Sequence, residues 1–190
     1  MARNPFITGE KRYGIAVNTL KLSPADPTKD NGPVIQAMLA RCERLPPGRY
    51  YVASTISTTK FGCKLLGASQ PAYVKTDASW DGGTTDNATV LIWNGAMDAA
   101  QTMIKVCHAN CTIADIGLIG QPLEKVHYEP PSPVTLITLY DPGPPMQPVS
   151  NTCIERVMLG SAQRGVYAAP GTHCDHVNIT DTVCSRINVC

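Results

Sequence analysis

The stretch DNGPVIQAMLARCERLPPGRYYV, residues 30–52, decides the fold because it passes from a helical pattern to a strand pattern. Its apolar side chains first recur at the spacing of one helix face, as Val34, Ile35, Met38, Leu39 and Cys42. We therefore predict a short amphipathic helix over residues 33–44, with Pro33 tolerated in its first turn. Pro46 and Pro47 are expected to end this helix, because proline disfavours helical geometry, and Gly48 to let the chain reverse.

Beyond this turn, short β-branched runs separated by small and polar residues predict that the rest of the chain is almost entirely β. Three runs share a pattern with apolar residues at positions 1, 4 and 6. They begin at Ile113, Ile154 and Cys174, so that the first two lie 41 residues apart and the last two lie 20 apart. With VTLITLY (134–140) as an intervening rung, this indicates a repeat of twenty-odd residues, which is typical of solenoids. An ordinary β-sandwich is the alternative that the repeat leaves open.

Composition narrows the possible partners. With 16 basic and 15 acidic residues among 190, the formal charge is +1, so the chain lacks the basic field that nucleic-acid binding needs, and we expect no nucleic-acid partner. No apolar stretch is long enough to span a membrane, and residues 1–14 show no signal-peptide core. The eight cysteines could form a disulfide framework, but without a sign of an oxidising compartment we favour free thiols in the core.

The opening stretch, continued by GCKLLGAS (62–69), resembles the start of the pectate-lyase-like single-stranded right-handed β-helix proteins, which include many phage tailspikes. The matching residues are Asp30, Ile35, Gln36, Ala37, Leu45, Pro46, Gly48, Tyr50, Val52, Leu65 and Gly67. One departure is that ARCER (40–44) stands where the family usually has more glycine. The resemblance covers about residues 26–190. It implies an all-β fold, a right-handed parallel β-helix, whose first turn is covered by a short N-terminal capping helix.

The same resemblance implies a function. We expect residues 1–29 to form an extended N-terminal arm that docks onto other virion tail proteins, and residues 30–190 to form the β-helix domain. The protein is then a virion structural protein, the N-terminal or body part of a phage tailspike or tail fibre, homotrimeric and attached to host surface polysaccharide. Because the repeat still runs at Cys190, we expect the chain to be the front part of a longer protein. The alternative is a secreted, extracellular or virion-associated enzyme that degrades polysaccharide, either a lyase or a glycoside hydrolase.

Catalysis on this fold would need paired carboxylates on neighbouring turns, because glycoside cleavage uses one acid and one base or nucleophile. The repeat alignment makes Glu155 and Asp175 the candidate catalytic residues. It forms two columns of residues: Ala114, Glu155 and Asp175 in one, and Asp115, Arg156 and His176 in the next. A surface charge ladder is the alternative interpretation of the same columns.

Two further kinds of site were considered. Trp80 and Trp93 are the candidate carbohydrate-binding residues, since aromatic rings can stack on sugars, although Trp93 could equally belong to the core. His173, Cys174, His176 and Cys184 could all ligate zinc, but their spacing does not match the paired separations of structural zinc sites. We therefore predict no metal and no cofactor.

Overall fold

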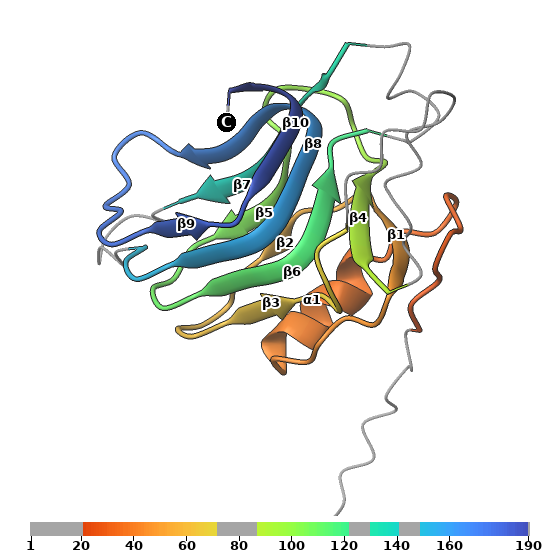
Figure 1. Cartoon of the computed structure of the whole chain (residues 1–190), viewed down its shortest axis with the longest axis horizontal. Coiled ribbons are helices and arrows are strands. Elements are labelled where there is room, and N and C mark those ends of the chain that lie inside the picture. Colours follow the sequence, from red (N-terminus) through yellow and green to blue (C-terminus); the bar gives the residue numbers. More distant parts are fainter. Residues whose placement is uncertain (1–20, 72–86, 122–129, 141–148, 190) are drawn as a thin grey trace, which may run out of the picture.

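The computed structural model describes residues 21–71, 87–121, 130–140 and 149–189. In these ranges one short helix, α1 (Gly32–Ala40), precedes ten strands that form a single curled sheet (Figure 1). Every strand pair in this sheet is parallel. The strands are β1 (Gly48–Val52), β2 (Ile56–Ser57), β3 (Lys64–Leu66), β4 (Thr89–Trp93), β5 (Thr102–Val106), β6 (Thr112–Ile119), β7 (Ser132–Leu139), β8 (Cys153–Ala168), β9 (Asn178–Thr180) and β10 (Val183–Val189).

The pairings sort into three stacks. Stack A contains β3, the start of β6, the start of β8 and β9. Stack B contains β1, β4, the end of β6, the middle of β8 and the start of β10. Stack C contains β2, β5, β7, the end of β8 and the end of β10. The chain passes repeatedly through stacks B, C and A in this order. This path curls the sheet around one apolar interior.

The long strands change stack at residues in the left-handed backbone region. Between stacks A and B these are Asp115 (φ 58°) and Arg156 (φ 50°), and between stacks B and C it is Ser161 (φ 51°). Before stack A, the corner residues are Asn110 (φ 58°) and Asn151 (φ 54°). Asparagine and aspartate tolerate this conformation better than most residues, whereas arginine does not, so Arg156 is the unusual member.

The observed register confirms the first part of the predicted repeat. Ile113 pairs with Ile154, and the two apolar residues that follow in each run pair as predicted, Ile116 with Val157 and Leu118 with Leu159. These side chains are all buried and stack on one another inside the curl.

The third copy of the repeat was aligned wrongly. The partner of Ile154 is Ile179, five residues beyond Cys174. The reason is that the chain turns a corner at His176 (φ 56°), so the strand of stack A begins only at Asn178. The apolar pattern starting at Cys174 therefore spans the corner and the strand together.

The predicted helix exists but is shorter than expected, and prolines do not end it. It stops at Ala40, and Cys42 then adopts a left-handed conformation (φ 56°). The backbone amides of Cys42 and Glu43 donate to the carbonyls of Leu39 and Met38, 3.0 Å away in each case. This is the Schellman arrangement, with a cysteine in the place that glycine usually takes.

Helix α1 and its flanks cover the first strand of each stack. Asn31 donates its backbone amide (2.9 Å) to the carbonyl of Tyr51 in stack B. The Gln36 side chain donates to the Ser57 carbonyl and accepts from the Ser57 amide in stack C, both at 2.7 Å. The Leu45 amide donates to the Leu66 carbonyl in stack A. Backbone groups that would otherwise lie unpaired at a sheet edge are thus satisfied.

The described part of the predicted N-terminal arm, residues 21–29, lies against this same end. The Ala25 amide donates to the Arg49 carbonyl at 2.7 Å, and the Asn94 side chain donates to the Pro27 carbonyl at 2.8 Å. At the opposite end of the curl lie β9 and β10 (Figure 1). Among the described residues, no helix has the length and apolar character needed to cross a lipid bilayer.

Candidate functional site

The register separates the two predicted catalytic carboxylates. Glu155 pairs with Thr180, whereas the Asp175 carbonyl accepts from the amide of Asn151, four residues before Glu155. His176 likewise falls beside the Asn151 corner and not beside Arg156. The two predicted columns of side chains therefore break at their third member, and Glu155 and Asp175 are not opposite each other on neighbouring strands.

Around Glu155 the structure places a charge network instead of a carboxylate pair. The Arg156 guanidinium contacts Asp115 through Nε at 2.6 Å and Glu155 through Nη2 at 2.9 Å, while Arg44 Nη1 lies 3.4 Å from Asp115. The hydrogen bonds from Arg156 lower the pKa of the Asp115 carboxyl below its usual value, and the same contacts raise the pKa of Arg156. This arrangement corresponds to the surface charge ladder that the sequence left open.

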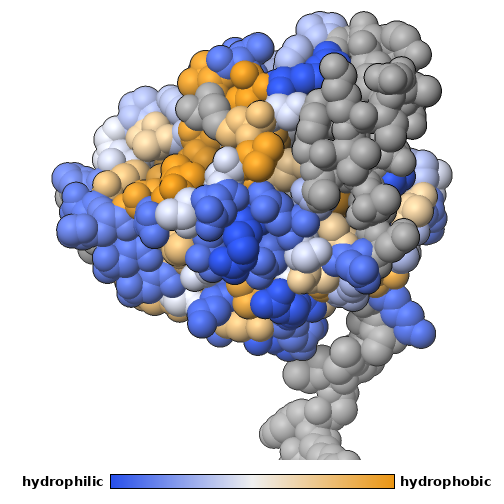
Figure 2. Space-filling view, viewed as in Figure 1, coloured by the Kyte–Doolittle hydropathy of each residue, from blue (hydrophilic) through white to orange (hydrophobic). Residues whose placement is uncertain are grey.

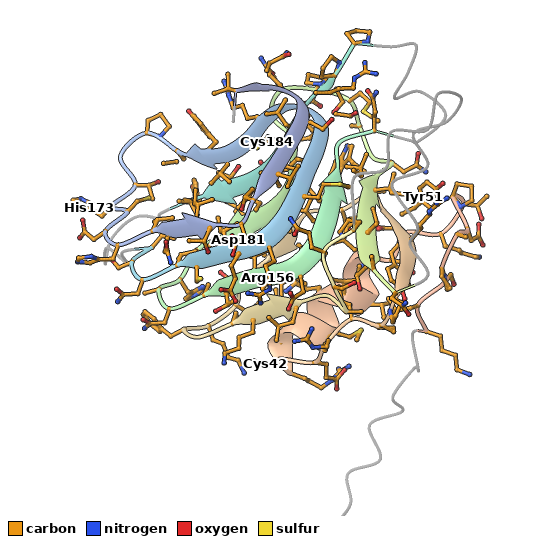
Figure 3. All side chains as sticks on the ribbon, viewed as in Figure 1. Cys42, Tyr51, Arg156, His173, Asp181 and Cys184 are labelled. Atoms are coloured by element: carbon orange, nitrogen blue, oxygen red, sulfur yellow. The ribbon has the colours of Figure 1, made fainter. Side chains whose placement is uncertain are left out.

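The corner that carries Arg156 continues onto the next turn of the chain. Because Thr180 pairs with Glu155 and Val183 with Met158, Asp181 (φ 49°) is level with Arg156, and Figure 3 shows the two on neighbouring turns of the chain. The Asp181 carbonyl accepts from Gln70 Nε2 at 3.0 Å. The polar groups described at this corner thus pair with one another and form no carboxylate pair.

The two predicted sugar-stacking residues have different outcomes. Trp93 is fully buried, and its indole Nε1 donates to the Ala96 carbonyl at 2.9 Å. Trp93 therefore belongs to the core, which is the alternative that the sequence left open. Its buried ring cannot stack on a sugar. Trp80 lies outside the described residues.

The cysteine and histidine side chains do not assemble a metal centre in the part of the chain that the structure describes. Cys42, Cys63, Cys107, Cys111, Cys153 and Cys174 are free thiols, whereas Cys184 is disulfide-bonded. Burial raises the pKa of the Cys111 thiol to about 11, so this sulfur is protonated at neutral pH. The predicted placement of thiols in the core is confirmed only for Cys63 and Cys111, since Cys42 is exposed and the other three are half-buried. Cys184 contradicts the prediction of free thiols.

A polar groove lies on the outer side of stack C. We call it the lateral groove; its cavity volume is about 230 Å³. Strands β5, β7 and β8 supply most of its lining, which includes Thr102, Lys105, Thr138, Tyr140, Arg164 and Tyr167. Ala99 and Ala100 close one side.

Two cation–aromatic pairs organise this groove. Lys105 Nζ lies 3.5 Å from the centre of the Tyr140 ring, and the Arg164 guanidinium carbon lies 4.4 Å from the centre of the Tyr167 ring. Such contacts hold a cation in place without neutralising it. On the strands between them, the hydroxyls of Thr102 and Thr138 are 2.9 Å apart. The groove can therefore present two fixed positive charges, aromatic edges and hydroxyls to one ligand.

The sequence analysis missed this groove because its residues come from three strands that are far apart in the chain. The available signal was that Lys105 is the charged residue of TMIKV and that Arg164 is the charged residue in the second half of β8, SAQRGVYA. Only the register of stack C shows that these interruptions face the same groove, since Lys105 pairs with Thr138 and Thr138 with Tyr167.

A second cavity, of about 530 Å³, opens at the end of the curl opposite α1. Its lining is mainly apolar and includes Leu139, Leu159, Val166, Val177 and Ile179. Figure 2 shows apolar surface on this part of the molecule. The cavity is the inner face of the last turn of the chain and carries no cluster of chemically active side chains.

Comparison with known proteins finds no counterpart: neither a protein-family model, nor a curated protein, nor a solved structure matches this chain. The functional argument therefore depends on the geometry alone.

Proposed function

We propose that this chain forms a right-handed parallel β-helix, similar to those of phage tailspikes, and that it is a virion structural protein that attaches to glycans of the host surface. The observation that carries the proposal is the cyclic order of the three parallel stacks, which leaves a rigid lateral face with an aromatic and polar groove. Solenoids bind ligands along such extended faces, and sugars favour the combination of aromatic rings and hydroxyls that this groove offers.

The proposal includes a homotrimer and docking to other tail proteins through residues 1–29. A covered first turn supports the docking part, because α1 and residues 21–29 close one end of the stack with backbone hydrogen bonds. A stack closed at one end is suited to contacting other proteins through that end.

The test combines sedimentation with glycan binding. The full chain is expected to sediment as a trimer and to bind polysaccharide extracted from the surface of a susceptible host. The polysaccharide is expected to keep its length after long incubation, because Glu155 is held by Arg156 and does not face Asp175. A monomer that binds no surface glycan would refute the proposal, and shortened chains whose formation is abolished by Glu155→Gln would establish the degrading enzyme instead.

A further inference from the structure

We infer that the lateral groove binds an extended acidic polysaccharide, with Lys105 and Arg164 each engaging a separate anionic group. This inference rests on the proposed glycan attachment and adds to it the charge of the ligand, its minimum length and the two residues that select it.

The first step is the charge of the groove. Lys105 and Arg164 both line it, are both half-buried, and form no ion pair with any carboxylate in the described residues. Elsewhere in those residues the charged corner at Arg156 is neutralised by Asp115 and Glu155. Two half-buried cations without a counter-ion among the described residues favour an anionic ligand, because partial burial weakens the screening by water.

Among the described residues, the carboxylate nearest in sequence to the groove wall is already occupied. Asp98 precedes Ala99 and Ala100, and its Oδ1 accepts from the Ala100 amide at 2.8 Å while its Oδ2 accepts from Gln101 Nε2 at 3.2 Å. Those hydrogen bonds close a local turn. Within the described ranges, no carboxylate therefore neutralises Lys105 or Arg164.

The second step is the distance between the cations. In the register of stack C, Lys105 lies level with Thr138 and Tyr167, and Arg164 lies three residues before Tyr167 on β8. Two strand spacings and three residues of extended chain place the Cα atoms of Lys105 and Arg164 about 14 Å apart. The two charged groups are also held over different rings, Lys105 over Tyr140 and Arg164 over Tyr167. We therefore expect each cation to bind its own anionic group on an extended chain.

The third step distinguishes a glycan from a nucleic acid. Thr102 and Thr138 line the groove beside the two cations and share a hydrogen bond. Thr138 is buried, whereas the hydroxyl of the half-buried Thr102 can form a second hydrogen bond, to a ring hydroxyl of a sugar. A nucleic acid would require a denser row of cations, and the chain has a formal charge of only +1. Arg164 can bind a carboxylate through two N–H groups, and Lys105 adds a point charge.

The experiment measures affinity by calorimetry for alginate, polysialic acid, neutral dextran and a single-stranded DNA oligonucleotide of matched length. Lys105→Gln and Arg164→Gln are each expected to weaken binding to at least one acidic glycan about fivefold, and the double variant about 25-fold, which is the size of partly exposed charge contacts. Arg164→Lys should recover part of the loss. Arg41→Gln is the matched control, because Arg41 is exposed at the C-terminal end of α1 and pairs with Glu43.

Each outcome is informative. Binding of acidic glycans with losses confined to the groove variants supports the inference. If dextran binds as tightly as the acidic glycans, or if the groove variants bind acidic glycans normally, the inference is overturned while glycan attachment stands. Tighter binding to DNA also overturns it, and binding to no glycan, including host polysaccharide, refutes the proposed function itself. Unchanged thermal unfolding of the variants ensures that losses of affinity are local.

Discussion

The left-handed conformation of Arg156 leads to a prediction in which the usual order of two substitutions is reversed. Inside an extended strand, glycine is less stable than alanine by about 0.5–1 kcal/mol, because it loses more backbone freedom. At φ 50° the Cβ atom of any other residue meets the following carbonyl at a cost of about 1–2 kcal/mol, and glycine avoids this cost. We therefore expect the Arg156→Gly protein to be more stable than the Arg156→Ala protein by about 1 kcal/mol.

Both variants lose the contacts to Asp115 and Glu155, so this loss cancels in the comparison between them. The Arg156 side chain is 44 % exposed, so solvent screens these contacts, and their loss should make the Arg156→Ala protein less stable than the wild-type protein. Urea unfolding at neutral pH measures the free energies, provided that the denaturant slopes agree.

Gln163, on the same strand and outside the left-handed residues, is the matched control. There the ordinary order is expected, with Gln163→Ala more stable than Gln163→Gly. An alanine variant at 156 that is as stable as the glycine variant would show that the corner between stacks A and B is not left-handed at this residue, and the register built on it would be wrong.

Three further predictions test other parts of the molecule. Leu39→Ala should lower the free energy of unfolding by about 3 kcal/mol, because it leaves a cavity at the buried face of α1. Met38→Ala changes a half-buried residue and should lower this free energy by less in the same urea titration. The pKa of Asp115 is lowered in the folded protein, so its carboxylate stabilises the fold at pH values above the ordinary pKa of 3.8. This stabilisation is lost as the pH falls through the lower, folded-state pKa. The difference in unfolding midpoint between the wild-type and Asp115→Asn proteins should therefore be present at pH 7 and become smaller towards pH 3. In the native protein at pH 8, iodoacetamide should modify the exposed Cys42 rapidly. It should modify the buried Cys111, whose pKa is about 11, far more slowly. Mass spectrometry measures both rates, and equal rates would contradict the prediction.

Parts of the fold that depend on apolar spacing could be predicted from the sequence. Val34, Ile35, Met38 and Leu39 indicated α1, and the pairing of the runs at Ile113 and Ile154 followed from apolar residues that must be buried on one side. The curled parallel sheet is the observed consequence. A periodic apolar pattern determines which side chains are buried, and for this reason the structure confirms these two predictions.

Features that depend on backbone conformation could not be predicted in the same way. The helix ends at Ala40 and is followed by Cys42 in the left-handed region, and the chain turns corners at Arg156 and His176. Cysteine and arginine rarely adopt this conformation, so their residue types gave no sign of it. Without the His176 corner, the pattern at Cys174 looked like a third copy of the strand. That five-residue error placed Asp175 beside Glu155. The groove residues were missed for a separate reason, because they come from three distant strands and meet only through the register of stack C.

The parallel stacking has one more consequence. Neighbouring strands are about 4.8 Å apart, so charged side chains on the outer side of stack C can be moved across the strands only in whole steps of that length. The fold thus fixes the backbone positions of such charges in steps of one strand spacing. The side chains of Lys105 and Arg164 can follow a small difference in the charge spacing of a ligand. A difference larger than their reach would require a charge on a different strand or an added turn of chain.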